Sequence, residues 1–224
     1  MKLKEAVPLQ TRIYVRRRQR EWQRSRLLAR GLRGLANTPA GSRQIWQDLR
    51  AGWSSGWAAS PSYLEAMAAA VLDGHLDVLE CGTGLTTLVL ASLARSIGAS
   101  ITSLEHDPAW FELVRRELRR FGLEANVVLA PLRSYGDFEW YDVDASSLSD
   151  FSLVACDGPP NFAQGGRYGL VPILGPRLTS GSTILLDDAA RPSEQQTLRR
   201  WESELGIAYE VRKAGRAFAV ASVP

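Results

Sequence analysis

The fold is decided by the stretch Leu76–Leu88, which reads L-D-V-L-E-C-G-T-G-L-T-T-L. An apolar run ends there in a glycine-rich turn and a second apolar pattern begins, which is typical of a strand, a tight turn and a helix start. Gly82 and Gly84 lack a Cβ, so the backbone can turn sharply and a ligand can approach the main chain closely. Thr86 or Thr87 is suited to cap the helix. The N–H groups of that first helical turn would face the cleft above the strand end, which makes the turn a candidate small-molecule site.

Two classes of cofactor use such a turn, and an ordinary tight connection between strand and helix is a third interpretation. The dinucleotide fingerprint G-x-G-x-x-G requires a third glycine, but Thr87 stands at that position. Glu80 lies two residues before the first glycine. Its carboxylate can accept hydrogen bonds from a cationic amine but would repel a pyrophosphate. The residues favour a nucleotide-like cofactor over an ordinary turn. They decide only in part between a dinucleotide and a cofactor that carries a cationic amine.

Length and composition indicate one α/β domain with an appendage, because 224 residues suffice for a sizeable core but hardly for two domains. No apolar run approaches the ~20 residues that span a bilayer. The first residues, M-K-L-K-E-A-V-P, lack the apolar segment of an export signal, so we expect a cytoplasmic protein. Cys81 and Cys156 follow buried strands and are expected to be reduced core residues.

Positive charge is concentrated in the first residues of the chain. Residues 1–34 hold eleven Lys and Arg against two Glu, a charge of +9, which leaves 3 − 9 = −6 for the rest. We therefore expect a basic helical N-terminal arm over residues 1–38. Such a segment can meet the phosphates of RNA or of anionic lipid, or it can be a solvated helix whose few apolar residues dock on the domain. Both interpretations stay open.

A helical cap or lid is expected over residues 39–73, before the main domain at 74–224. Glycines, an asparagine and a proline at 31–39 predict a hinge after the arm. Trp46, Trp53 and Trp57 then lie among Gly and Ser, where they can fill the core or stack on a ligand. Ser60 and the proline after it predict the start of a helix that runs to about residue 72.

Strands and helices alternate in the rest of the chain, as in a parallel sheet with crossover helices. Strands are expected at 76–81, 100–105, 125–130, 151–157 and 182–188, and helices at 86–97, 108–121, 168–178 and 192–205. The long loop 131–150 is expected to be functional or mobile. A closing pair of strands, 207–213 and 217–223, predicts a terminal hairpin.

Five motifs together resemble class I S-adenosylmethionine-dependent methyltransferases. They are E-C-G-T-G-L-T-T, the strand ends S-L-E-H-D, A-C-D-G-P-P and L-L-D-D, and the terminal hairpin. The resemblance covers residues 60–224. It implies an α/β, doubly wound, mostly parallel seven-stranded sheet with a C-terminal antiparallel hairpin. One departure is Thr86, which stands where many members of the family have a third glycine.

The resemblance also implies the residues that hold S-adenosylmethionine. They are Glu80, Gly82, Thr83, Gly84, Thr86, Glu105, His106 and Asp157. Among these, Glu80 and the two glycines would line the methionine part, and His106 would flank the adenosine. Glu105 would accept hydrogen bonds from the ribose hydroxyls, a role that a carboxylate at a strand end can fill on chemical grounds alone.

Catalysis is expected to rest on aspartates, because neither histidine of the chain falls in the predicted acceptor pocket. The resemblance to catechol-type O-methyltransferases implies a divalent-metal site, possible for Mg²⁺, at Asp157, Asp187 and Asp188. Those enzymes commonly use an asparagine where Asp188 stands. The alternative has Asp157 acting alone as general base, with the other two aspartates capping a helix or facing solvent.

The methyl acceptor is expected to be a hydroxyl of a small molecule or glycan, and less readily an amine. Two alternatives remain open: an RNA methyltransferase that uses the basic arm, and a non-catalytic nucleotide-binding module. The stretch D-G-P-P-N-F is a poor match to the D-P-P-Y motif of amino-methylating nucleic-acid enzymes, because Gly158 interrupts it.

Overall fold

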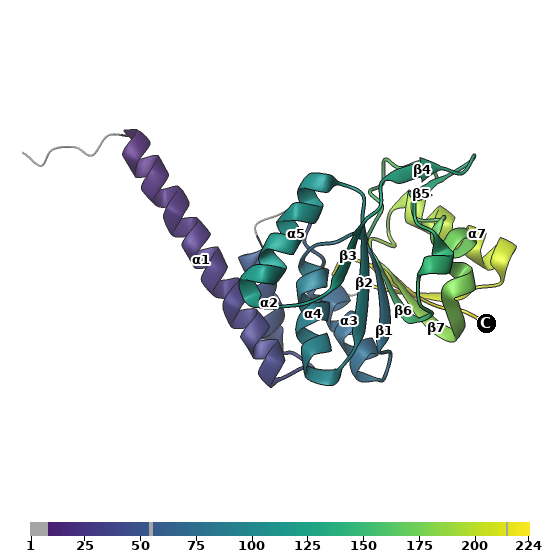
Figure 1. Cartoon of the computed structure of the whole chain (residues 1–224), viewed down its shortest axis with the longest axis horizontal. Helices are drawn as coiled ribbons and strands as arrows, with labels where there is room; N and C mark the ends of the chain where they lie inside the picture. Colours follow the sequence, from purple (N-terminus) through teal and green to yellow (C-terminus); the bar gives the residue numbers. More distant parts are fainter. Residues whose placement is uncertain (1–8, 54–55, 214) are drawn as a thin grey trace, which may run out of the picture.

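A seven-stranded sheet forms the centre of the molecule, with strand order β3-β2-β1-β6-β7-β9-β8 (Figure 1). The computed structural model describes residues 9–53, 56–213 and 215–224. The strands are β1 (Asp77–Cys81), β2 (Ser100–Glu105), β3 (Asn126–Leu129), β6 (Phe151–Cys156), β7 (Leu178–Leu186), β8 (Ala208–Arg212) and β9 (Phe218–Ser222). Strand β9 runs antiparallel to both of its neighbours, β7 and β8, and the other pairs of neighbouring strands in this sheet are parallel. The predicted fold, including its terminal hairpin, is confirmed.

Helices cover both faces of this sheet, as Figure 1 shows. One face carries α1 (Leu9–Asn37), α2 (Arg43–Gly52), α3 (Pro61–Leu72), α4 (Leu85–Ile97) and α5 (Pro108–Phe121), and the other carries α6 (Leu170–Leu174), the 3₁₀ turn η2 (Gly175–Arg177) and α7 (Pro192–Leu205). Successive strand residues feed the two cores: Val78 packs on the first and Leu79 on the second. This alternation follows from the two-residue period of a strand.

Local capping residues fix several helix ends where the sequence predicted them. Asp107 accepts hydrogen bonds from the backbone N–H groups of Ala109 and Trp110, and α5 ends at Gly122 with a φ of 60°. The Ser60 side chain accepts from the N–H of Tyr63 at the start of α3. The expected threonine cap of α4 is wrong, because α4 begins one residue earlier and its N-cap residue is Gly84.

The expected hinge at 31–39 is also wrong, because α1 continues unbroken to Asn37. Its glycines serve close helix packing instead. A Cβ on Gly31 would lie 2.6 Å from Cγ of Leu49, and one on Gly34 would lie 2.8 Å from Cγ1 of Ile45. Both contacts are with α2, so these glycines let the two helices approach each other and the arm is anchored to the domain.

The two halves of α1 differ in their surroundings. Leu28, Leu32 and Leu35 are buried against the domain, whereas residues 13–24 are exposed and project away from the body (Figure 1). The part of the predicted arm at 1–8, and residues 54 and 55 of the predicted lid, lie outside the described residues. Among the described helices, none is long and apolar enough to cross a membrane.

Residues 131–150 contain more regular structure than a loop. An antiparallel ribbon of β4 (Leu132–Ser134) and β5 (Glu139–Tyr141) is followed by the 3₁₀ turn η1 (Ala145–Ser147). Trp140 and Tyr141 are buried on the second core. The expectation of a long loop is therefore wrong, because two short strands and a 3₁₀ turn occupy much of this stretch.

Gly52 provides a test of the packing between α1 and α2. A Cβ there would lie 2.7 Å from the Cα of Leu28, which is backbone and cannot swing aside. We expect Gly52→Ala to lower the free energy of unfolding by about 1–3 kcal/mol, as overpacking does. Gly175→Ala is the control, because its Cβ would meet its nearest neighbour at an ordinary 3.6 Å. Equal denaturation midpoints for the two variants would contradict this packing.

Candidate active site

A cavity of about 400 Å³ opens at the carboxyl ends of β1, β2 and β6. Its wall at the β1 and β2 ends includes Gly82, Thr83, Glu105, His106, Trp110 and Tyr141, and its wall at the β6 and β7 ends includes Asp157, Asn161, Phe162, Arg167, Asp188, Arg191 and Arg216. In open α/β sheets ligands bind at this edge, where neighbouring crossovers leave in opposite directions. The volume is within the range of small-molecule sites.

The glycine turn after β1 lies against the end of β6. Gly82 has a φ of 86°, which favours glycine, and a Cβ there would lie 2.7 Å from the backbone nitrogen of Gly158. The two strand ends therefore approach as closely as the backbone allows. Trp110 donates from Nε1 to the carbonyl of Thr83 at 2.6 Å and so fixes the outer side of the turn.

Glu105 is the most heavily hydrogen-bonded carboxylate of the site. Its Oε2 accepts from the backbone N–H and the hydroxyl of Thr83 at 3.1 and 2.6 Å. Its Oε1 accepts from the backbone N–H groups of His106 and Asp107 at 2.8 and 2.9 Å. Burial alone would raise the pKa of Glu105, but the hydrogen bonds from His106 and Thr83 outweigh it and the pKa is lowered. Glu105 is therefore a fixed anion that joins the ends of β1 and β2.

Glu80 lies beneath the turn, with only 1% of its surface exposed. Its Oε2 accepts from the Thr87 hydroxyl at 2.7 Å, and that hydroxyl oxygen accepts from the N–H of Gly84 at 2.9 Å. Glu80 thus supports the turn from inside. Burial raises its pKa to about 7. Thr86, in the first turn of α4, is likewise buried.

His106 and Tyr141 lie side by side on the cavity wall, with ring centroids 6.4 Å apart in an edge-on arrangement. The His106 Nδ1 is 3.0 Å from Oε1 of Glu105. The Tyr141 side chain is buried, and its hydroxyl has no hydrogen-bond partner among the described residues. A buried hydroxyl without a partner is uncommon in proteins.

The structure brings Asp157, Asp187 and Asp188 together, with ligand atoms within 4.8 Å of one another. Parallel pairing of β6 with β7 places their carboxyl ends side by side. Asp187 is completely buried, and burial raises its pKa to about 7, with further contributions from the other two aspartates. Burial also raises the pKa of Asp157.

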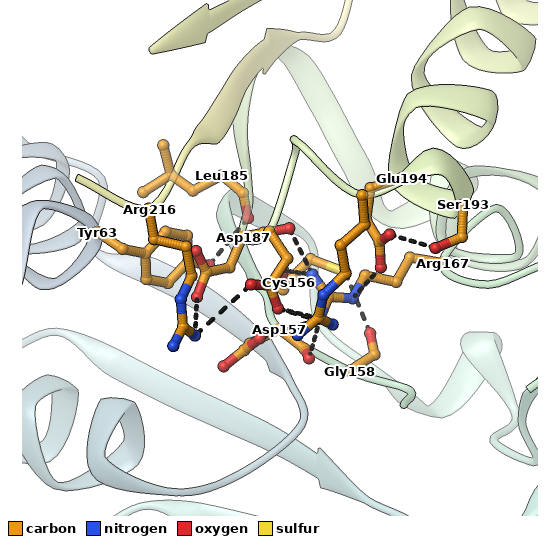
Figure 2. Close-up of polar contacts among 12 residues, drawn as sticks. Tyr63, Cys156, Asp157, Gly158, Arg167, Leu185, Asp187, Ser193, Glu194 and Arg216 are labelled. Carbon is orange, nitrogen blue, oxygen red and sulfur yellow. Dashed lines mark hydrogen bonds and ion pairs between the residues drawn. The ribbon is translucent and has the colours of Figure 1, made fainter. Parts of the chain in front are cut away.

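Three arginines surround these acids. The Arg167 Nη2 is 3.0 Å from Oδ1 of Asp157 and 3.6 Å from Oδ2 of Asp188. Asp188 also lies 2.9 Å from Nη1 of Arg191 and 3.6 Å from Nη1 of Arg216. Figure 2 shows Arg167 between the labelled acids. Most of the negative charge at the β6 and β7 ends is thereby paired.

Sequence reasoning did not identify Trp110, Tyr141 or Arg167 as site residues. Trp110 lies on α5 and Tyr141 on β5, so both reach the cavity through packing that no local pattern encodes. For Arg167 one signal was present: an arginine among the glycines and prolines of the segment after β6, where a buried charge needs acidic partners.

Residues 79–189 match a family model described as a methyltransferase domain. No curated protein matches the chain significantly. Among solved structures, the chain resembles an O-methyltransferase from Bacillus cereus in complex with SAH, with a TM-score of 0.59, 15% identity, and coverage of 85% of this chain and 95% of the other.

Two further structures have the same fold. One is an SAH-bound methyltransferase from Podospora anserina, with a TM-score of 0.57, 18% identity, and coverage of 80% of this chain and 86% of the other. The second is a precorrin-6y C5,15-methyltransferase from Geobacter metallireducens, with a TM-score of 0.57, 15% identity, and coverage of 77% and 93%. With the family match and the predicted sheet both found, residues 79–189 form a methyltransferase domain, consistent with the class I S-adenosylmethionine-dependent methyltransferases that the sequence resembles.

Proposed function

We propose that the enzyme transfers the methyl group of S-adenosylmethionine to a hydroxyl of a small-molecule or glycan acceptor. The observation that carries this proposal is the position of Asp157, which lines the cavity next to the glycine turn and can take a proton from an acceptor. Likeness to the O-methyltransferase from Bacillus cereus supports the hydroxyl over the less favoured amine. The bound cofactor supplies the activated methyl group, so the protein has only to align the acceptor and remove its proton.

For the cofactor, we propose that Gly82, Thr83, Gly84, Glu105 and His106 form its seat, with Glu80 and Thr86 supporting the turn from inside. Glu105 already accepts hydrogen bonds at both oxygens, and a carboxylate has about four acceptor positions. A ribose hydroxyl would thus replace the Thr83 hydroxyl, which can rotate toward another acceptor.

Asp157 is the proposed general base. Its Oδ1 accepts from Nη2 of Arg167, so the side chain is held in one orientation and its other oxygen can take the acceptor proton. Its pKa is raised by burial, which brings the carboxylate closer to the range where a base works efficiently at neutral pH. A hydroxyl acceptor with a lowered pKa, such as a phenol, would need the least help from this base.

A divalent metal at the three aspartates does not fit this site. Asp157 is paired with Arg167, and Asp188 with Arg191 and Arg216, so the two carboxylates that line the cavity already have cationic partners. The proposed reaction therefore needs no Mg²⁺ at these residues.

We further propose that the exposed half of α1 binds a phosphate-bearing partner, either RNA or anionic lipid. Arg16, Arg20 and Arg24 follow one side of the helix at four-residue spacing and are exposed. On another side, Arg26 stacks over the ring of Trp22 at 4.5 Å. Arginine and exposed aromatic residues together are suited to phosphate surfaces.

Replacing Glu105 tests the cofactor seat. We expect the wild type to bind SAH in a calorimetric titration and Glu105→Ala to bind at least tenfold more weakly, because charge-assisted hydrogen bonds contribute about 1–3 kcal/mol each. The control is Glu112→Ala, an exposed residue of α5. A wild-type protein that does not bind SAH, or that binds NAD more tightly, would contradict the proposed cofactor.

Replacing Asp157 tests the base. With labelled S-adenosylmethionine and a panel of phenols, sugars and amines, we expect methyl transfer to a hydroxyl and a loss of about 10²-fold or more in Asp157→Asn, since general-base catalysis contributes 10²–10⁴-fold. SAH affinity should stay within a few-fold. Asp150→Asn, at the opposite end of β6, is the control. Full activity of Asp157→Asn would exclude this residue as base.

The arm is tested by changing Arg16, Arg20 and Arg24 together to Gln. We expect the wild type to bind RNA or anionic vesicles, with affinity that falls steeply as salt rises, and the triple variant to bind more weakly with a shallower salt dependence. Parallel titrations with RNA and with vesicles distinguish the two partners. The matched control changes the exposed Arg115, Arg116 and Arg119 of α5 to Gln. Equal binding by both triple variants would leave no role for α1.

A further inference from the structure

Arg167 is a fully charged side chain with only 2% of its surface exposed. Its Nη1 donates to the carbonyl of Asp187 at 2.6 Å and to that of Cys156 at 3.4 Å. Its Nη2 donates to Asp157 twice, to the carbonyl at 2.5 Å and to Oδ1 at 3.0 Å. The guanidinium therefore joins the carboxyl ends of β6 and β7 (Figure 2). Backbone carbonyls are acceptors that hold it whatever the protonation of the acids.

The same arginine also faces the start of α7. Its Nε is 3.8 Å from Oε1 of Glu194, a fully buried residue whose Oε2 accepts a hydrogen bond from the Ser193 hydroxyl. Glu194 is not among the residues that line the cavity. A buried glutamate on the far side of the guanidinium indicates that Arg167 is a permanent part of the structure and not a side chain that swings out for a ligand.

The formal charges around the three aspartates come close to balance without a metal. Asp157, Asp187, Asp188 and Glu194 contribute −4, and Arg167, Arg191 and Arg216 contribute +3, which gives −4 + 3 = −1. The same four acids with one divalent ion and no arginine would give −4 + 2 = −2, so the arginines already balance the acids more closely than a metal alone would. A divalent ion added to the arginines would give +1 in a buried region, where repulsion between cations is weakly screened.

The three aspartates also differ in how closely arginine nitrogens and hydrogen-bond donors approach their carboxylate oxygens. Asp157 and Asp188 have close arginine nitrogens, but both oxygens of Asp187 lack a hydrogen-bond partner among the described residues, and its closest cation, Nη1 of Arg216, is 4.0 Å away. Of the three aspartates, Asp187 is thus the one whose oxygens a metal could bind without displacing a close arginine. A single carboxylate is a poor ligand set for Mg²⁺, which needs octahedral oxygen coordination.

We infer that the three arginines take the place of a divalent metal at the acceptor end of the cavity. Arg167 is the fixed cation, and Arg216 is the cation that keeps a metal from binding Asp187 and Asp188. Arg167 is a positioning residue, because it holds Asp157 and touches the acceptor only through it. The role of Asp157 rests on the proposed function, but the competition between arginine and metal does not.

The experiment compares Mn²⁺ binding by the full-length wild type and by Arg216→Gln, after chelation and dialysis. Arg216 is one-third exposed, so this variant should fold, whereas replacing the buried Arg167 endangers folding. The control is Arg212→Gln on β8, where the arginine is exposed and pairs with Glu210. Calorimetry and the melting temperature with and without millimolar Mn²⁺ are the readouts, and SAH binding is measured on the same samples.

We expect no saturable Mn²⁺ binding and no rise in melting temperature for the wild type and Arg212→Gln, and at least a tenfold gain in Mn²⁺ affinity for Arg216→Gln. Submillimolar Mn²⁺ binding by the wild type would overturn the inference. The absence of Mn²⁺ binding in all three proteins would overturn the inference as well, because arginine would then not be what competes with the metal. Failure to bind SAH would instead count against the proposed function and leave the Mn²⁺ comparison intact.

Discussion

Burial of charge at the carboxyl ends of β6 and β7 is the constraint on which the acceptor end of the site depends. Parallel pairing puts Asp157 beside Asp187 and Asp188, and burying one such charge without a partner costs several kcal/mol. Arg167 meets this cost with hydrogen bonds to three backbone carbonyls and to a carboxylate. The segment that leads from β6 to α6 therefore has to fold back over the strand ends, and in doing so it forms one wall of the cavity.

The opposite end of the cavity uses hydrogen bonds in place of ion pairs. Glu105 is surrounded by N–H and hydroxyl donors, which lower its pKa, whereas Glu80 lies deeper with fewer donors and has a pKa raised to about 7. The proposed cofactor end thus combines a permanent anion with a carboxyl whose charge can respond to a cationic ligand. Such a division between neighbouring carboxylates is typical of functional sites.

Much of the fold could be predicted because its signals are local. The helices at 108–121 and 192–205 have a proline in their first turn and a glycine after their last residue, and both were predicted with correct bounds. The sheet followed from alternation of strands and helices and from the terminal hairpin. The predicted aspartates do meet at one edge, because the ends of adjacent parallel strands must lie together.

The remaining features depend on contacts between distant residues. Gly31 and Gly34 read as helix breakers in the sequence, but the close approach of α2 makes them packing residues. Tyr141 reaches the cavity from β5, a strand of only three residues, which is too short to show a recognisable pattern in the sequence. Arg167 mattered most: the acids resemble a metal site when they are read without the arginine that the fold places among them.

Anomalous diffraction from crystals grown with SAH and Mn²⁺ would test this description of the site most directly. It predicts SAH above Gly82 with its ribose at Glu105, the Arg167 guanidinium between Asp157 and Asp187, and no Mn²⁺ peak among the three aspartates. A strong anomalous peak there, with the arginines displaced, would contradict it.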